Sequence, residues 1–260
     1  MERRSLPGLL LVLAAARAAA FDLTTCGGAV QAGEIADLRA DLVCPPLAAA
    51  VALTAGSTLN LNGHTISGTS TTSGTGIQCG GRRSDGFCVV HGPGLITNFG
   101  VAVVGGGASL RLEALTARGN GSGLAHKAPR LIELVDVDMS DNAEYGITAR
   151  GGRMRLANVT ANHNGIGGVL APVVKMAHVT AIGNGRDGGV FLTFKSHRAT
   201  RIIDSTITGN DGLGQGFDLL TTRPVRLMNT TCARGARVRT TSDGGVETTT
   251  IVHRLGCAED

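Results

Sequence analysis

A ten-residue motif that recurs about every 22 residues constrains the fold of this chain more than any other feature. Each copy begins with a long polar residue followed by an aliphatic one, and closes with Asn. Five copies align without gaps: RLEALTARGN from Arg111, ELVDVDMSDN from Glu133, RLANVTANHN from Arg155, KMAHVTAIGN from Lys175 and RIIDSTITGN from Arg201. A fixed period of this length indicates an array of stacked structural units.

Weaker copies flank these five, VVHGPGLITN from Val89 and RLMNTTCARG from Arg226. With the first included, the closing asparagines are Asn98, Asn120, Asn142, Asn164, Asn184 and Asn210. A glycine and an apolar residue follow each of them, from Gly100-Val101 to Gly216-Phe217. We expect Asn and Gly to form the corners of each unit, because both residues tolerate left-handed backbone.

The apolar segments within each unit are too short for a helix, and many of their residues are β-branched. The chain also has 39 glycines and only 3% aromatic residues, a composition that suits many tight turns. These features predict an all-β fold, a right-handed single-stranded parallel β-helix of about eight coils stacked about 4.8 Å apart. A leucine-rich horseshoe is the alternative, but its leucine spacing and helical half are missing.

The N-terminus has the composition of an export signal. Arg3 and Arg4 precede a short apolar run, and Ala18-Ala19-Ala20 supplies a cleavage site. We therefore predict that residues 1–20 are a signal peptide and that the mature protein is secreted or periplasmic. The leader carries three Arg and one Glu, so its removal lowers the net charge from +4 to +2, which gives no indication of a nucleic-acid partner. No later segment has the sequence of a transmembrane helix.

Residues 21–260 are predicted to be one domain, because a solenoid grows by adding units. We expect residues 21–55 to cap the first coil, residues 56–239 to form the coils and residues 240–260 to cap the last. All six cysteines lie in this domain, and an even number in an exported chain indicates disulfides. The most natural pairing is sequential: Cys26 with Cys44, Cys79 with Cys88 and Cys232 with Cys257.

The segment STLNLNGHTISG, which begins at Ser57, the pair Gly76-Ile77 and the repeats that follow resemble the bacterial right-handed parallel β-helix repeat proteins. The resemblance extends over about residues 45–235 and implies a pectate-lyase-like superfamily fold. It implies no single activity, because this fold occurs in lyases, glycosidases, epimerases, phage tailspikes and proteins with no known reaction. The polygalacturonase and pectate-lyase motifs are absent, so the resemblance assigns no catalytic residue.

Two polar pairs are candidates for proton transfer. The fourth position of the repeat places His178 beside Asp204 of the next coil, and a histidine oriented by a carboxylate is a general acid or base near neutral pH. Alternatively, the Asn and Asp residues at this position form a ladder that hydrogen-bonds along the stack. The ninth position offers a second pair, Asp141 and His163, at a turn.

No metal is predicted from the cysteines, because no pair has zinc spacing. One coil gathers four carboxylates that could hold Ca²⁺ as a cofactor: Glu133, Asp136, Asp138 and Asp141. Their spacing matches no calcium loop, and neighbouring residues of a strand alternate between faces.

Two outer surfaces are candidates for substrate binding. On the strand after the Gly-apolar pair, alternation predicts these outward residues: Gln78, Ala125, Lys127, Thr148, Arg150, Leu170, Phe191, Thr193 and Asp218. Within that set, Lys127, Arg150, Leu170 and Phe191 form a predicted sugar-contacting patch. The second surface is the first position of the repeat, which we call the basic column: Arg111, Glu133, Arg155, Lys175, Arg201 and Arg226.

Stacked cations repel one another, and a partner with regularly spaced carboxylates would relieve that repulsion. The sequence therefore predicts an exported β-helix repeat protein that binds or processes a polysaccharide, with an acidic polysaccharide as the expected partner. The alternative is a non-enzymatic structural or surface-assembly module. The residues leave open whether the protein is an enzyme; lyase, glycosidase and epimerase chemistry are the classes to consider.

Overall fold

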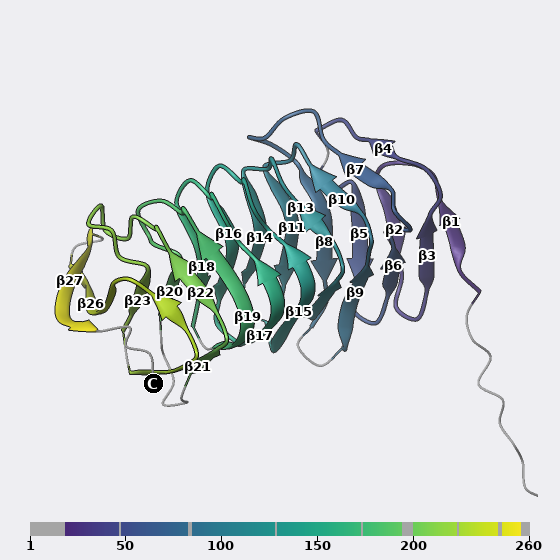
Figure 1. Cartoon of the computed structure of the whole chain (residues 1–260). Helices are drawn as coiled ribbons and strands as arrows, with labels where there is room; N and C mark the ends of the chain where they lie inside the picture. Colours follow the sequence, from purple (N-terminus) through teal and green to yellow (C-terminus); the bar gives the residue numbers. More distant parts are fainter. Residues whose placement is uncertain are drawn as a thin grey trace, which may run out of the picture.

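The computed structural model describes residues 19–46, 48–82, 85–127, 129–172, 174–193, 200–222, 224–243 and 246–255. These residues form strands and turns that coil into a parallel β-solenoid of about nine turns (Figure 1). The predicted all-β parallel solenoid is thus confirmed, with about one turn more than expected. Within the described ranges, no helix is long and apolar enough to cross a membrane.

One sheet, called sheet B here, has eleven strands. Its strands are β2 (Gly28–Val30), β5 (Val51–Thr54), β8 (Thr75–Gly80), β11 (Val101–Gly106), β14 (Ser122–Lys127), β16 (Tyr145–Arg150), β18 (Gly167–Ala171), β20 (Val190–Leu192), β23 (Leu219–Thr221), β26 (Gly235–Asp243) and β27 (Val246–Leu255). Among the strands described here for sheet B, β27 alone pairs in an antiparallel manner, with β26. This hairpin ends sheet B in the region predicted to cap the solenoid.

The second sheet, sheet A, has sixteen strands in two arms. The first arm contains β1 (Phe21–Leu23), β3 (Ile35–Leu38), β6 (Thr58–Asn60), β9 (Phe87–His91), β12 (Ser109–Glu113), β15 (Leu131–Asp138), β17 (Arg153–Thr160), β19 (Val174–Ile182), β21 (Thr200–Ile203) and β24 (Val225–Met228). The second contains β4 (Leu42–Val43), β7 (Thr65–Ser67), β10 (Leu95–Thr97), β13 (Thr116–Ala117), β22 (Thr206–Thr208) and β25 (Thr231–Cys232). The long strands β15, β17 and β19 run through both arms.

Residues 21–55, which we expected to be a cap, already belong to the solenoid. They form β1 to β5, and these strands pair in parallel with the strands of the next coils. Parallel pairing therefore begins at Phe21.

The interior is a stack of aliphatic columns. The second position of the repeat illustrates this, because its residues are in register from coil to coil and at most 2% exposed: Leu112, Leu134, Leu156, Met176 and Ile202. Burying one such side chain contributes about 1.5–3 kcal/mol. The apolar column thus fixes which residues of the same strands point outward.

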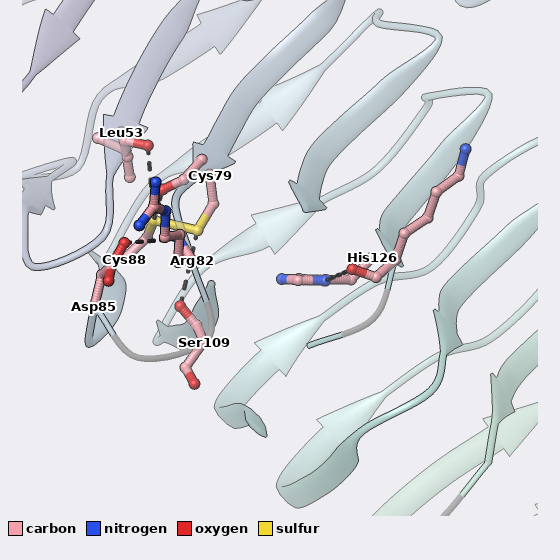
Figure 2. Close-up of a disulfide and its surroundings, with 9 residues drawn as sticks. Leu53, Cys79, Arg82, Asp85, Cys88, Ser109 and His126 are labelled. Carbon is pink, nitrogen blue, oxygen red and sulfur yellow. Dashed lines mark hydrogen bonds between the residues drawn. A yellow bond between two sulfur atoms is a disulfide. The ribbon is translucent and has the colours of Figure 1, made fainter. Parts of the chain in front are cut away.

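Two of the predicted disulfides are confirmed, Cys26–Cys44 and Cys79–Cys88. The second bridge is buried and closes the excursion between β8 and β9 (Figure 2). Cys232 is also disulfide-bonded. Its predicted partner, Cys257, lies outside the described residues.

Candidate functional site

The basic column forms as predicted on the first arm of sheet A. Each member is paired in register with the next along the stack: Arg111 with Glu133, Glu133 with Arg155, Arg155 with Lys175, Lys175 with Arg201, and Arg201 with Arg226. The five cations are exposed, and Glu133 is partly buried. Six side chains therefore line one outer face at the spacing of the coils.

A shallow groove of about 480 Å³ lies along this column. Two positions further along each strand is a second outward column, which we call the floor: Val135, Ala157, Ala177 and Ile203. These small apolar side chains keep the surface low beside the long cations. The groove therefore combines a charged wall with an apolar floor.

The column divides into two halves by the pairing of its charges. In the first half, Arg155 donates to Glu133 across 2.8 Å, and Arg111 bonds to Glu113 across 2.5 Å. In the second half, Lys175, Arg201 and Arg226 form no ion pair with any residue that the structure describes. The basic column thus ends in three consecutive cations whose charge is not neutralised within the described chain: Lys175 and Arg201 line the groove, and Arg226 lies one coil beyond it.

The structure also brings together a cluster that sequence reasoning missed. His91 Nδ1 lies 2.7 Å from Glu113 Oε2, and the other oxygen of Glu113 accepts from Arg111. The side chain of His91 is 41% exposed, whereas that of Glu113 is only 24% exposed. The signal was present in the sequence, because aligning the degenerate copy from Val89 with the copy from Arg111 places His91 beside Glu113.

His178 and Asp204 lie at an exposed corner between the two arms of sheet A, on neighbouring coils. The corner residues have left-handed backbone, with φ between 46° and 55°: Asp136, Asn158, His178, Asp204 and Asn229. Asn158 donates to Asp136 across 2.8 Å, and Asn229 donates to Asp204 across 3.0 Å. His178 stands between these two pairs and has no hydrogen bond or ion pair with Asp204 in the described part of the chain. The corner therefore favours the ladder interpretation.

The other predicted patch, on sheet B, is divided. Lys127 and Arg150 are exposed and adjacent in register. Phe191 lies two strands further along and is partly buried against a second apolar cluster that contains Phe217 and Leu220. The structure thus places the cations and the aromatic ring of this patch in different surroundings.

Asp141 and His163 do come together at an exposed turn, with 3.7 Å between Nδ1 and the carboxylate. The four carboxylates considered for Ca²⁺ do not converge. Glu133 accepts from Arg155 and Asp136 from Asn158, whereas Asp138 is bonded by Arg118. No group of three or more metal-ligating residues occurs within the described ranges.

The closing asparagines form a buried ladder, here called the Asn ladder: Asn120, Asn142, Asn164, Asn184 and Asn210. From Asn142 to Asn210, the side-chain oxygen of each rung accepts from the backbone N–H and the side-chain amide of the preceding rung, across 2.9–3.2 Å. Each rung is at most 4% exposed. Asn98, which the sequence aligns with these asparagines, is not part of the ladder, because the bend Gly92-Pro93-Gly94 has one residue more than the next coil. Phe99 takes the place of the rung and donates its N–H to Asn120.

Asp218 is buried, which corrects the expectation that it points outward. Leu219, not Phe217, is in register with Val190, so Asp218 takes the position that Gly189 has one coil earlier. A Cβ at Gly189 would lie 2.6 Å from the amide of Asn210. At Asp218 the carboxylate itself replaces the next rung: one oxygen accepts from Asn210, and the other from the N–H groups of Ala233 and Arg234.

A buried histidine faces the interior of sheet B. His126 is 1% exposed, and its ring lies over Gly105, where a Cβ would be 2.0 Å away. Nε2 has no hydrogen-bond partner among the described residues. Burial lowers the pKa of His126, although hydrogen bonds to the backbone at Lys127 and Ala108 act in the opposite direction. Figure 2 shows its ring on the same side of the solenoid as the Cys79–Cys88 bridge.

Comparisons with protein-family models, with curated proteins and with solved structures gave no match for this chain. The candidate site therefore has to be interpreted from its own geometry.

Proposed function

We propose that this protein is an exported β-helix repeat protein of the right-handed, pectate-lyase-like type and that it binds an acidic polysaccharide along the outer groove of sheet A. One observation carries the proposal: Lys175, Arg201 and Arg226 stack on consecutive coils without a carboxylate partner in the described chain. An opposite charge beside such cations offsets their mutual repulsion, and here an acidic ligand would supply it.

The apolar floor supports the same ligand class. Ala157, Ala177 and Ile203 lie directly beside the cations and form a flat surface. Successive residues of this surface are one coil apart, which is about 4.8 Å. A polymer with evenly spaced carboxylates can place one charge on each coil and lay its ring faces on the floor. Guanidinium groups suit carboxylates because they can donate two parallel hydrogen bonds.

The test is a titration of the mature protein with oligogalacturonates and with neutral xylo-oligomers at low salt. We expect the acidic oligomers alone to bind, and the double variant Arg201→Glu with Arg226→Glu to bind at least tenfold more weakly. A matched pair on the opposite face, Lys127→Glu with Arg150→Glu, changes charge equally and should leave binding nearly unchanged. Binding of neither polymer would favour the alternative of a structural module, and an equal loss in both double variants would contradict a binding site in the groove.

A further inference from the structure

Both ends of the solenoid present open strand edges. Within the described ranges, β1 pairs only with β3, and β24 pairs only with β21. Figure 1 shows β1 at one end of the molecule and the β26–β27 hairpin at the other. Because an unpaired edge is a template for a further strand, we propose that the protein, after the predicted removal of residues 1–20, stacks head to tail on other copies of itself. The last coil of one copy, with β24, then meets the first coil of the next, with β1.

The apolar column of the interior is open at the same two ends. Its inner members are at most 2% exposed, whereas Phe21 is 38% exposed and Leu227 is only partly buried. The side chains of this column are in register from the first coil to the last: Phe21, Ala36, Leu59, Val90, Leu112, Leu134, Leu156, Met176, Ile202 and Leu227. Stacking Leu227 of one copy on Phe21 of the next would continue the column and remove both side chains from water.

The other exposed apolar side chains lie at these ends as well. Among the described residues, three large apolar side chains are exposed, namely Phe21, Val43 and Met228. Phe21 and Val43 belong to β1 and β4, the two ends of the sheet A path that face away from the later coils, and Met228 belongs to β24. Single exposed apolar residues are common. Their restriction to the terminal coils, however, indicates that the ends rather than the sides of the solenoid are contact surfaces.

The N-terminal end is acidic. Residues 21–44 contain four carboxylates and one arginine, Arg39. Arg39 is shared between Asp22, at 2.8 Å, and Asp37, at 3.1 Å. One cation therefore serves two carboxylates, and Glu34 and Asp41 add two further exposed negative charges.

The C-terminal coil is basic. Residues 222–240 contain five arginines and no carboxylate, and the next acids, Asp243 and Glu247, flank the turn of the β26–β27 hairpin. Arg226, Arg234 and Arg237 form no ion pair with any residue that the structure describes. A head-to-tail contact brings opposite charges together, whereas a contact between two like ends opposes like charges. The charges thus select a second copy in the same orientation as the partner.

Continuation of the column fixes the register of the contact. With Leu227 opposite Phe21, Met228 lies opposite Asp22, and Arg226 is two residues from Met228 on the same outward face. Arg226 can therefore reach Asp22 diagonally across the junction. Because the two surfaces that meet are different, each added copy leaves one free end of each kind, and association grows into a filament. This contact is separate from the groove, although Arg226 belongs to the basic column.

The test is sedimentation velocity of the mature chain, residues 21–260, without any oligosaccharide, at several protein concentrations and at low and high salt. We expect species that grow beyond a dimer with concentration and become smaller at high salt, where the end charges are screened. Met228→Glu places a carboxylate opposite Asp22 and should weaken association at least tenfold. Gln78→Glu is the matched control, because it makes the same change of charge at an exposed position on the side of the solenoid. It should associate like the wild type.

A charge exchange tests the orientation. Asp22→Lys and Arg226→Glu should each weaken association at least tenfold, whereas the double variant should recover it, because opposite charges again face each other across the junction. A wild type that stays monomeric at every concentration and salt, growth that stops at a dimer, or an equal loss in Gln78→Glu would overturn the inference. A double variant as weak as the single ones would also overturn it. Binding of acidic oligomers by a monomeric wild type would leave the proposed function intact while this inference fails.

Discussion

Two polar columns run along this solenoid, one buried and one exposed, and they differ in whether their side chains find partners within the protein. The Asn ladder is buried, and every rung is hydrogen-bonded to the next until Asp218 ends the series. The basic column is exposed, and its second half has no partner in the described chain. The polar groups of a buried column must form hydrogen bonds with one another, since an unpaired polar group costs about 1–3 kcal/mol in the interior. An exposed repeat has no such constraint and is available to a ligand.

The largest expected effect concerns the end of the buried column. Asp218→Ala would remove the acceptor of the Asn210 side-chain amide and of three backbone N–H groups, those of Asn210, Ala233 and Arg234. We expect the free energy of unfolding to fall by at least about 3 kcal/mol, measured by chemical denaturation. Binding of acidic oligomers by the folded fraction should not change. Asp204→Asn is the control, because Asn tolerates the left-handed corner and its side-chain oxygen can accept the one exposed hydrogen bond that Asp204 receives, so stability should change by well under about 1 kcal/mol. A small effect at Asp218 would mean that the ladder is not needed for stability.

A smaller effect is expected at His126, whose pKa is lowered by burial. The unfolded chain takes up this proton near pH 6.5, whereas the folded protein resists it until the pH is lower. Stability should therefore fall as the pH drops below about 6.5, by at most about 1.4 kcal/mol per pH unit from this one group, and level off below the folded-state pKa.

The His126→Leu variant isolates that contribution. Its stability should change less between pH 7 and pH 5 than that of the wild type, whereas His163→Leu, at an exposed turn, should keep the wild-type slope. Identical pH dependence in His126→Leu and the wild type would show that the buried ring does not contribute to acid sensitivity.

The sequence predicts the fold and the outer columns well, because in coils of equal length the equivalent positions of the repeat lie side by side. The basic column follows directly from the alignment of the repeats. Errors arise where one coil has a different length. The extra residue near Pro93 displaces Asn98, and the longer loop before Leu219 turns Asp218 inward.

Contacts between neighbouring columns were harder to predict than register. His178 and Asp204 do stand on neighbouring coils, yet the carboxylate of Asp204 accepts from Asn229, because a left-handed corner aims each side chain along the stack in a way that spacing does not specify. His91 and Glu113 were aligned by the repeat as well, but only the structure shows that one donates to the other and that Arg111 joins them.

The comparison between the paired and unpaired halves of the basic column can be measured directly as the salt dependence of oligouronate binding. Two double variants differ only in which half they neutralise: Arg201→Gln with Arg226→Gln, and Glu133→Gln with Arg155→Gln. We expect the first to weaken binding at least tenfold and to flatten its dependence on salt, because two unpaired charges are lost. The second variant removes a Glu–Arg pair whose net charge is already zero. It should leave both the affinity and its dependence on salt nearly unchanged. Equal losses in the two variants, or binding that does not respond to salt, would contradict the account.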